Sequence, residues 1–491
     1  MADVAVVGSG PNGLAAAVVA ARAGLSVRVY EESPVPGGGA RTEELHESGF
    51  RHDLGPAVHP MALASPFFRM FELDARVRFV TPGISFAHVL GSDSVALAHR
   101  SLDLTVADLG RDGAPWRRLF QPLVRHVDAV ARATLAPPAR LSGASAALVP
   151  VGLGACVDAA LRGRVFREEK ARALLAGLSA HAMNGGRSLA GSIVGVTLAA
   201  HAHARGWPIP IGGSQAITDA LLAELSLRGG RVETGTVVRD LRELEGHSAV
   251  ILDLTPHAFS DIAASDLSSR ERRRACRFRF GPGVMKVDYS LDGQIPFQDA
   301  RLAGASTLHI GGTAAEVESA EDAVLHGSRA DRPFILLSQP TVFDPARAPA
   351  GKHVAWAYAH VPAWDDESDP EQVTRAIEEI APGFRDLIRG ATVRAAIAMP
   401  GLSRNFVGGD IGSGAVGLRQ LLARPRFGPS PWRTPLPGVF LCSASTSPGP
   451  GVHGMGGYHA ARHALAYLGI RDTFTRSAAR REAEAGRAGY P

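Results

Sequence analysis

The pattern of apolar and polar positions predicts one group of buried strands linked by helices. Short runs rich in β-branched residues occur at 4–7, 25–31, 249–256 and 438–445, and an apolar run of small residues at 11–24 predicts a helix between the first two. Parallel strands need such crossover connections, and the helices then cover the faces of the sheet. We therefore predict an α/β unit whose strands come from both ends and the middle of the chain.

A second group of segments is typical of strands in another sheet. The segments 285–291, 307–312, 334–338 and 353–360 are short, contain β-branched and aromatic residues, and partly alternate. They predict an antiparallel sheet that forms the floor of a substrate-binding lobe.

Residues 65–205 depart from this pattern of strands and crossover helices, and they predict a helical insertion. Apolar residues recur three and four positions apart at 116–135 and 170–181, and a break rich in Pro, Gly, Ser and Ala at 137–147 separates the two segments. The apolar segment 190–200 is shorter than the roughly 18 residues that a membrane-spanning helix needs. It predicts a buried helix or the wall of a tunnel.

Composition excludes several classes of function. The 491 residues include 20% charged residues, and the net charge is +4. No basic block with interleaved aromatic residues is found, so a nucleic-acid partner is not expected. The three cysteines, Cys156, Cys276 and Cys442, are far apart and form neither a metal motif nor a disulfide framework, which favours a reducing compartment. Met1 leads into the first strand without a charged leader segment, and we expect a cytoplasmic protein.

A glycine motif joins the first predicted strand to the first predicted helix. Gly8, Gly10 and Gly13 form G-x-G-x-x-G, and Glu31 ends the next predicted strand. Gly8 permits a tight turn, Gly10 lets a pyrophosphate approach the N-terminus of the helix, and Gly13 lets the helix pack on the strand. Glu31 can accept both ribose hydroxyls. This context predicts a dinucleotide site and not a glycine turn without a ligand.

A second glycine cluster follows the predicted ribose acid. Segment 36–42, PGGGART, resembles the G-G-x-x-R extension of FAD-dependent oxidoreductases of the amine oxidase and phytoene desaturase superfamily. In that superfamily the glycines and the arginine lie along the pyrophosphate and ribityl chain of the flavin. The resemblance implies FAD as the cofactor. The alternative interpretation of Arg41 is a solvated loop cation.

Further segments resemble the same superfamily in the same order along the chain. They are 49–60, with G-F-x-x-D-x-G; 206–238, with P-x-G-G, a helix and a strand; and 438–457, which is similar to the closing flavin motif of phytoene desaturase-like proteins. Loop 404–414 is similar to one in proteins near phytoene desaturase, including pyridine nucleotide-disulphide oxidoreductase domain-containing proteins. The implied cofactor contacts are Gly8, Gly10, Pro11, Asn12, Gly13, Glu31, Glu32, Gly38, Gly39, Ala40, Arg41, Gly55, Pro56, Ala57, Val237, Val238, Ser445, Gly451, Val452, Gly454 and Met455.

The resemblance covers essentially the whole chain and implies its domain organisation. We expect an α/β fold with a Rossmann-like FAD-binding domain of glutathione reductase type and a discontinuous α+β substrate-binding domain. The FAD-binding domain is expected to take residues 1–75, 206–257 and 400–475. The substrate-binding domain, with its helical insertion, is expected to take 76–205 and 258–399, and a tail follows at 476–491.

Two side chains are candidates for catalysis. The resemblance places His59 where the chain returns towards the substrate, and a loop histidine bonded to the backbone is the alternative. Lys286 is one of only three lysines. Some amine oxidases use a lysine to hold a water at flavin N5, whereas a strand lysine that snorkels to solvent is the alternative here. No metal-ligand spacing is found, and for His459 and His463, which share a helix face, packing near the flavin is the preferred interpretation.

The resemblance implies an FAD-dependent dehydrogenase or desaturase that transfers a hydride from a largely apolar organic substrate to flavin N5. The sequence has no second strand–glycine–helix unit for NAD(P), so dioxygen or a quinone is the expected electron acceptor. A flavin amine oxidase is the alternative enzyme. A non-enzymatic lipid- or prenyl-binding protein of the Rab GDP-dissociation-inhibitor type is the alternative from another class. Contact with a membrane surface and a homodimer are left open.

Overall fold

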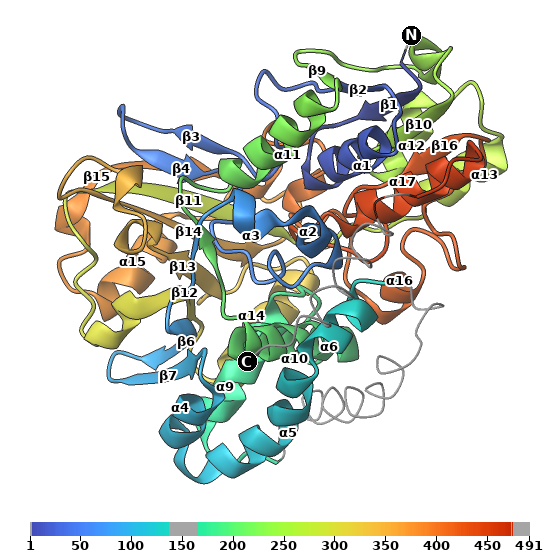
Figure 1. Cartoon of the computed structure of the whole chain (residues 1–491). Helices are drawn as coiled ribbons and strands as arrows, with labels where there is room; N and C mark the ends of the chain where they lie inside the picture. The colour runs from blue at the N-terminus through green and yellow to red at the C-terminus, as the bar shows by residue number, and fades with distance from the viewer. Residues whose placement is uncertain (1, 137–164, 473, 475–491) are drawn as a thin grey trace, which may run out of the picture.

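The computed structural model places most strands of the chain in two sheets, one in each of two lobes (Figure 1). It describes residues 2–136, 165–472 and 474. The predicted break at 137–147, Cys156 and the predicted tail 476–491 lie outside the described residues. The α/β fold class with a Rossmann-like sheet is confirmed, because parallel strands and crossover helices form the first lobe.

The first sheet consists of five short parallel strands from distant parts of the chain. Their order is β16-β10-β1-β2-β9. Val4 in β1 pairs with both Val27 and Ala249, so the strand that leads into the glycine motif is central and fully buried. The bounds are β1 Val4–Val7, β2 Val27–Tyr30, β9 Arg231–Glu233, β10 Ala249–Leu252 and β16 Val439–Leu441.

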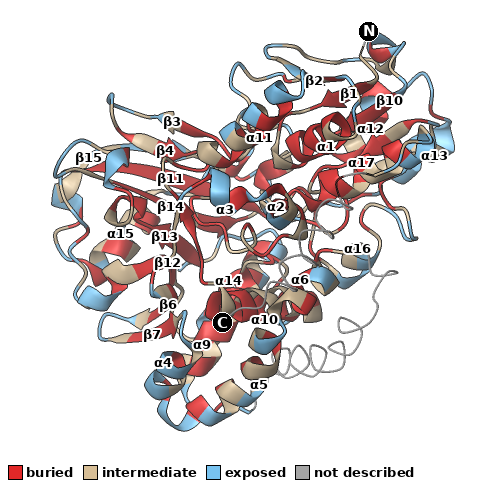
Figure 2. Cartoon of the chain, in the orientation of Figure 1, coloured by how far each residue is buried: buried red, intermediate tan, exposed pale blue. Residues whose placement is uncertain are grey.

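Helix α1 (Pro11–Arg22) is enclosed between the first sheet and two further helices, α11 (Gln215–Leu227) and α17 (Met455–Tyr467). Figure 2 shows α1 and the strands β1 and β10 as almost continuously buried. The α1–α17 crossing is close because α17 presents Gly457, where a Cβ would lie only 1.8 Å from the carbonyl oxygen of Asn12. The N-terminal and C-terminal parts of the chain are therefore packed backbone against backbone beside the glycine motif.

This close crossing makes Gly457 sensitive to a single methyl group. Gly457→Ala is expected to destabilise the protein by about 1–3 kcal/mol, because the new Cβ meets backbone that cannot rotate away. Urea unfolding followed by tryptophan fluorescence measures the effect. Ala464→Gly, on the same helix, is the control for a change in helix propensity. If Gly457→Ala unfolds at the wild-type urea concentration, the two helices do not cross at this distance.

The second sheet has seven strands in the order β15-β11-β14-β13-β12-β6-β7 and is antiparallel except where β12 runs parallel to β6. Its strands at 283–291, 305–310, 335–338 and 353–361 agree with the predicted antiparallel group. The bounds are β6 Ile84–Gly91, β7 Ser94–His99, β11 Gly283–Leu291, β12 Ala305–Ile310, β13 Ile335–Ser338, β14 His353–Val361 and β15 Ile388–Arg394.

Strands β6 and β7 were not expected, because the sequence predicted a helical insertion at 65–205. Residues 85–89 and 95–98 are all buried, so these strands lack the alternation between apolar and polar positions by which a half-buried strand is recognised. Apart from β5 Phe79–Val80, the other elements described in this region are helices, although the segment predicted as one helix at 116–135 forms two, α5 and α6. Among the described residues after β7, the α-helices of this region are α4 Leu102–Asp108, α5 Gly113–Arg125, α6 Val127–Thr134, α9 Glu169–Ala180 and α10 Leu189–Ala204.

Shorter elements connect the two lobes. The two-stranded pairs are β3 Thr42–Glu44 with β4 Arg51–Asp53, and β5 Phe79–Val80 with β8 Ile209–Pro210. The remaining α-helices of the described residues are α2 Pro66–Phe71, α3 Leu73–Arg76, α12 Pro256–Ile262, α13 Ser269–Ala275, α14 Ala314–Leu325, α15 Glu371–Ile380 and α16 Leu418–Leu422.

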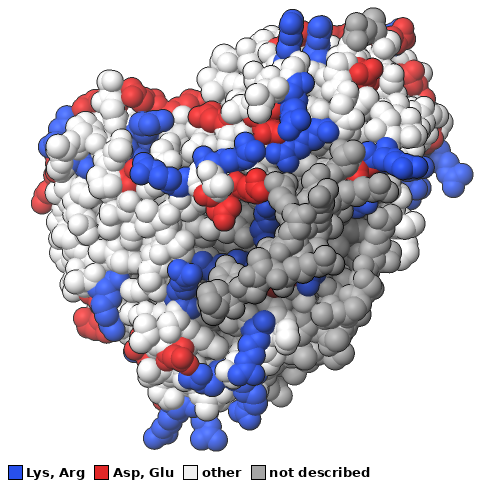
Figure 3. Space-filling model, viewed as in Figure 1, with Lys and Arg blue, Asp and Glu red and all other residues white. Residues whose placement is uncertain are grey.

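No helix within the described ranges is both long enough and apolar enough to cross a membrane. On the face drawn in Figure 3, basic and acidic side chains are both spread over the surface.

Candidate active site

One cavity of about 570 Å3 is lined by residues of both lobes. Gly10, from the first glycine motif, and Gly451, from the C-terminal motif, both line it. The two ends of the chain therefore share one cleft, as a dinucleotide bound by both motifs requires. The volume falls within the range of about 300–1,000 Å3 that is usual for small-molecule and cofactor sites.

The glycine motif forms the tight turn that the sequence predicts. Gly8 has a φ of +94°, and a Cβ on Gly13 would lie 2.1 Å from the carbonyl oxygen of Gly8. Gly13 therefore allows the helix to start directly against the turn. The space beside Gly10 is different, because a Cβ there would lie 2.6 Å from Oδ2 of Asp253. At this position the side chain of Asp253 itself requires the absence of a Cβ.

Glu31 is held in place while one edge of its carboxylate remains at the cavity. Its Oε2 accepts hydrogen bonds from the Ser9 backbone N–H at 2.7 Å and the Ser9 hydroxyl at 2.5 Å, and its Oε1 accepts one from Ser33 N–H at 2.8 Å. The residue is 9% exposed and lines the cavity. The neighbouring Glu32 forms an ion pair with Arg404 at 2.6 Å, with both side chains well exposed. The two adjacent acids thus have different roles.

Arg41 is buried, so the interpretation as a solvated loop cation is wrong. Its guanidinium donates to the Gly38 carbonyl at 3.0 Å, the Ser33 hydroxyl at 2.5 Å and the Leu402 carbonyl at 2.9 Å. It therefore joins the second glycine cluster to the loop before residue 404. A guanidinium has five N–H donors, so Arg41 can bind a further anionic or carbonyl oxygen in the cavity that it lines.

Most residues predicted from the sequence lie around this cavity, and five do not. Gly13, Ala57, Ser445, Gly454 and Met455 are buried or packed behind the lining: Ser445 donates to the carbonyl of the lining residue Ser413 at 2.6 Å, and a Cβ on Gly454 would lie 2.6 Å from the Phe67 ring. The predicted residues that line the cavity are Gly8, Gly10, Pro11, Asn12, Glu31, Glu32, Gly38, Gly39, Ala40, Arg41, Gly55, Pro56, His59, Val237, Val238, Lys286, Gly451 and Val452.

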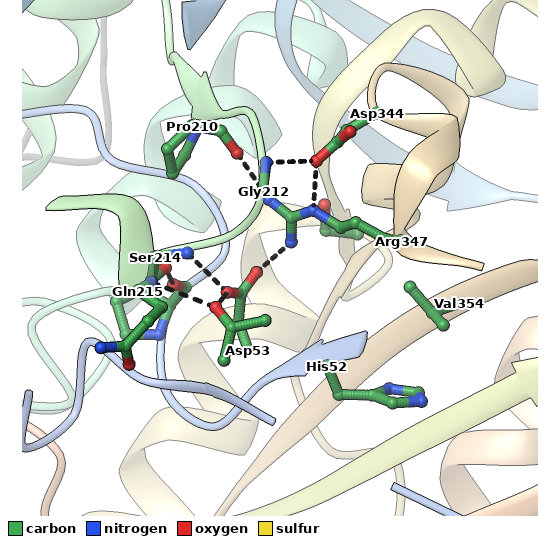
Figure 4. A network of polar contacts seen from close by, with 12 residues as sticks. His52, Asp53, Pro210, Gly212, Ser214, Gln215, Asp344, Arg347 and Val354 are labelled. Atoms are coloured by element: carbon green, nitrogen blue, oxygen red, sulfur yellow. Dashed lines mark hydrogen bonds and ion pairs between the residues drawn. The ribbon is translucent and has the colours of Figure 1, made fainter. Parts of the chain in front are cut away.

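A buried ion network holds the wall of the cavity between the lobes (Figure 4). Arg347 pairs with Asp53 and, at 2.9 Å, with Asp344, and these three side chains are at most 2% exposed. Burial opposes ionisation of Asp53, but Arg347 and hydrogen bonds from Thr42 and Ser214 keep its pKa below the usual value. Because Asp53 precedes the lining loop at 54–61, the network fixes that loop to the segment 210–214.

His59 belongs to the same wall. The backbone N–H of His59 donates a hydrogen bond to the carbonyl of Pro208, and the hydroxyl of Ser214 donates one to the carbonyl of Pro56. The single Ser214 hydroxyl proton is thereby used, so His59 Nε2–H donates to Ser214 Oγ at 2.8 Å and Nδ1 is the unprotonated nitrogen. Burial lowers the pKa of His59 to about 4, which keeps the ring neutral. His59 is 2% exposed. Its burial and these contacts favour a role in positioning the loop.

Lys286 does not snorkel to solvent, which corrects that interpretation of the sequence. It is 3% exposed, lines the cavity and pairs with Asp288 two positions along β11. Asp288 also pairs with Arg394 at 3.2 Å. Burial lowers the pKa of Lys286 although Asp288 opposes the shift, and burial raises the pKa of Asp288 although Lys286 and Arg394 oppose it. The cavity thus contains a buried lysine beside a compensating carboxylate.

An aromatic wall adjoins this lysine. Trp356 and Tyr358 project from the same side of β14 with their rings stacked, 5.4 Å between centroids and 7° between planes, and Tyr358 is opposite Lys286 in the strand register. Trp207 and His181 complete this part of the lining, together with Val194 and Leu198 of α10. The apolar segment 190–200 therefore forms a buried helix at the cavity wall.

Two histidines do not take the position expected from the sequence. His459 and His463 stack on the ring of Trp432, at 4.6 and 5.3 Å between centroids, and neither lines the cavity. The expectation that they pack near the flavin is therefore wrong, because their side of α17 faces Trp432. In the described part of the chain, no group of His, Cys, Asp and Glu side chains is arranged to hold a metal ion.

Several lining residues were not expected from the sequence. Asp253, Trp356 and Tyr358 lie in strands, or directly after one, where neighbouring residues give no local signal of a site. The glycines of 408–414 did provide a signal, since this loop contributes Asp410 to the lining. Folding brings these residues together with the two glycine motifs.

The fold and cavity define a two-lobed protein with a Rossmann-like lobe and an apolar chamber beside the glycine motifs. Residues 6–72 match the family model for an NAD(P)-binding Rossmann-like domain. The chain is 25% identical to pyridine nucleotide-disulfide oxidoreductase domain-containing protein 2 of Mus musculus, with 94% of this chain and 92% of the mouse protein covered. It is 28% identical to phytoene dehydrogenase of Streptomyces griseus, with 81% and 79% covered.

Comparison of structures gives the same fold. Putrescine oxidase, solved as the wild type bound to putrescine, matches with a TM-score of 0.58 at 17% identity, covering 95% of this chain and 98% of the other. The sequence relatives confirm the predicted recognition, a similarity to oxidoreductases such as phytoene dehydrogenase, and the solved structure shows that the fold is shared with a flavin amine oxidase.

The site fits FAD by its own geometry. The glycine turn at the N-terminus of α1 offers backbone N–H groups to a pyrophosphate, Glu31 presents a carboxylate beside it, and Arg41 retains unused donors. Gly451 places the C-terminal motif in the same cleft. These residues would hold the cofactor between the two ends of the chain.

Proposed function

We propose that this protein is an FAD-dependent dehydrogenase or desaturase acting on a largely apolar, non-cationic organic substrate. Bound FAD supplies the hydride acceptor, and dioxygen or a quinone is the proposed final acceptor. The observation that carries the proposal is the single cavity, which joins two glycine motifs from opposite ends of the chain to an apolar and aromatic chamber.

The chamber is suited to an apolar molecule. Leu198, Leu336 and Met183 line it beside the stacked pair Trp356 and Tyr358. Such side chains exclude water and are favoured partners of hydrocarbon surface. Exclusion of water also protects a hydride transfer from competing reactions.

The charges of the lining favour a neutral or anionic substrate over an amine. Glu31, Glu32 and Asp253 surround the glycine motif, not the aromatic wall. Asp410 is committed to the backbone N–H groups of Gly281, Gly412 and Gly414. Among the described lining residues, the charged side chain at the aromatic wall is Lys286, whose group with Asp288 and Arg394 is neutral or positive overall. A cationic diamine would meet no free carboxylate there.

The first test is the cofactor. The purified protein is expected to be yellow and to release FAD in a near-stoichiometric amount on denaturation, measured by absorbance and chromatography. A colourless protein that takes up no added FAD would contradict the proposal. FAD bound without reduction by any candidate substrate would instead favour a lipid- or prenyl-binding protein.

The second test separates the two enzyme hypotheses. Anaerobic mixing with panels of apolar alcohols, acids and polyenes is expected to bleach the flavin absorbance, whereas primary amines and diamines leave it oxidised. Bleaching by amines, with release of peroxide in air, would instead establish an amine oxidase.

Lys286 is the lining residue that we expect to influence reduction most directly. Lys286→Met is expected to retain FAD and to slow flavin reduction by the best substrate at least about a hundredfold, the low end of the effect of a positioned acid or base. Stopped-flow absorbance measures the rate across pH. Lys352→Met, which removes a surface lysine paired with Asp292, is the matched control. Equal rates and pH profiles for the Lys286 variant and wild type would exclude Lys286 from this step.

A further inference from the structure

Asp253 lies at the point where the glycine motif is expected to receive the cofactor's pyrophosphate. It directly follows β10, and its Oδ2 accepts a hydrogen bond from the backbone N–H of Gly13 at 3.0 Å. All three motif glycines contact it: a Cβ on Gly8 or Gly13 would lie 3.1 or 3.2 Å from the Asp253 Cβ, and one on Gly10 would lie 2.6 Å from Oδ2. The protein thus places its own carboxyl group at the N-terminus of α1.

This carboxyl group and a pyrophosphate would share one positive end of a helix. The unpaired N–H groups and dipole at a helix N-terminus favour an anion. Asp253 already uses the Gly13 N–H, is 7% exposed and lines the same cavity as Gly10, Pro11 and Asn12. Two negative groups so close together in a partly dry site repel each other strongly.

The neighbours of Asp253 do little to offset this repulsion. Glu31, directly after β2, adds a second negative charge, and the Cys442 thiol, directly after β16, is buried beside Asp253. Asn405 is uncharged and donates to the Asp253 backbone carbonyl at 2.8 Å. Burial, only partly opposed by the Gly13 hydrogen bond and reinforced by Glu31, raises the pKa of Asp253 to about 7. Burial together with Asp253 raises the pKa of Cys442, so the thiol stays neutral.

We propose that FAD binds to this protein with Asp253 protonated, so that loading the cofactor takes up one proton and Asp253 makes cofactor retention depend on pH. The proposal rests on FAD being the cofactor. Below the pKa of free Asp253 the carboxyl group is neutral and adds no charge beside the pyrophosphate. Above it, binding must first restore the proton, and the affinity falls as the pH rises.

The test is titration of the stripped, full-length protein with FAD, followed by quenching of flavin fluorescence at pH 6, 7 and 8. The wild-type Kd is expected to be about tenfold larger at pH 8 than at pH 6, the linkage for one proton whose free pKa is about 7. Asp253→Asn, which keeps the side-chain shape without the charge, is expected to give one Kd across this range, equal to that of the wild type at pH 6.

Two further measurements test whether Asp253 is the group that takes up the proton. Calorimetry of the wild type at pH 8, in buffers of different ionisation enthalpy, is expected to show uptake of about one proton per FAD. Asp410→Asn removes another buried carboxyl group of the lining whose pKa burial raises, and it is expected to keep the tenfold dependence.

The outcomes distinguish this inference from the proposed function. FAD binding with a Kd independent of pH, or a dependence that persists in Asp253→Asn, overturns the role of Asp253 and leaves the FAD enzyme intact. Failure to bind FAD at any pH overturns the proposed function and this inference with it.

Discussion

Replacing Arg347 with methionine is expected to lower the free energy of unfolding by about 3–5 kcal/mol, because it leaves two buried carboxylates without their cation. Asp53 and Asp344 are at most 2% exposed, and Arg347 pairs with both. Arg347 also donates to the Pro210 carbonyl at 2.8 Å, so the loss includes a third hydrogen bond (Figure 4). Methionine keeps much of the volume, which limits the effect of a cavity.

Urea unfolding at pH 7, monitored by tryptophan fluorescence and circular dichroism together, measures this change. Arg385→Met is the matched control, because Arg385 pairs with Glu371 on the surface with both side chains more than 40% exposed, and its loss is expected to cost at most about 1 kcal/mol. Similar effects of the two substitutions would show that the buried network is not a major source of stability.

The pH dependence provides a second criterion for this network. Since the pKa of Asp53 is lowered in the folded protein, its ionisation stabilises the wild type above the unfolded pKa of about 3.9, and this stability is lost as the pH falls through the folded value. Without Arg347 the buried carboxyl group favours its neutral form, so the deficit of Arg347→Met is expected to shrink between pH 7 and pH 5. A deficit independent of pH would indicate lost packing instead.

Replacing Glu31 with alanine is expected to weaken FAD binding by at least about a hundredfold, because two hydrogen bonds from ribose hydroxyls to a carboxylate contribute about 1.5–3 kcal/mol each. Glu31 is the acid at the end of β2 that lines the cavity while Ser9 and Ser33 hold it in place. Fluorescence titration with FAD at pH 6 measures the affinity. Thermal unfolding without FAD verifies that the variant is folded.

The adjacent acid is the control for this substitution. Glu32 pairs with Arg404 at an exposed position, so Glu32→Ala is expected to change the affinity for FAD less than about tenfold. If the Glu31 variant keeps wild-type affinity, the ribose is bound elsewhere. If both variants lose affinity equally, the effect is one of overall negative charge and not of a specific contact.

Local motifs were enough to predict the dinucleotide-binding half of the fold. The strand at 4–7, the glycine turn and the helix from residue 11 are neighbours in sequence, and steric freedom at Gly8 and Gly13 is a property of the local backbone. Four of the seven strands of the second sheet were predicted too, whereas β15 was not. Strands β6 and β7 were missed because burial on both faces removes the alternating pattern.

Side-chain environments were predicted less well. Lys286 was open to interpretation as a snorkelling surface lysine, but the second sheet buries it beside Asp288. Arg347 gave no signal at all, since its partner Asp53 is 294 residues away. Gly10 was explained by a pyrophosphate alone, although its neighbour in the folded protein is Asp253.

The sequence by itself determined the class of fold and the type of cofactor site, because the strand, the glycine turn and the following acid all lie within residues 4–31 and need no partner from a distant part of the chain. The resemblance already implied that residues near 10 and 451 contact one cofactor. Only the tertiary structure decided that the chamber beside them carries Lys286 and stacked aromatic rings, and that Asp253 occupies the start of α1. The physical reason is that burial and electrostatic pairing depend on which distant segments come together, whereas turn geometry depends on the local backbone.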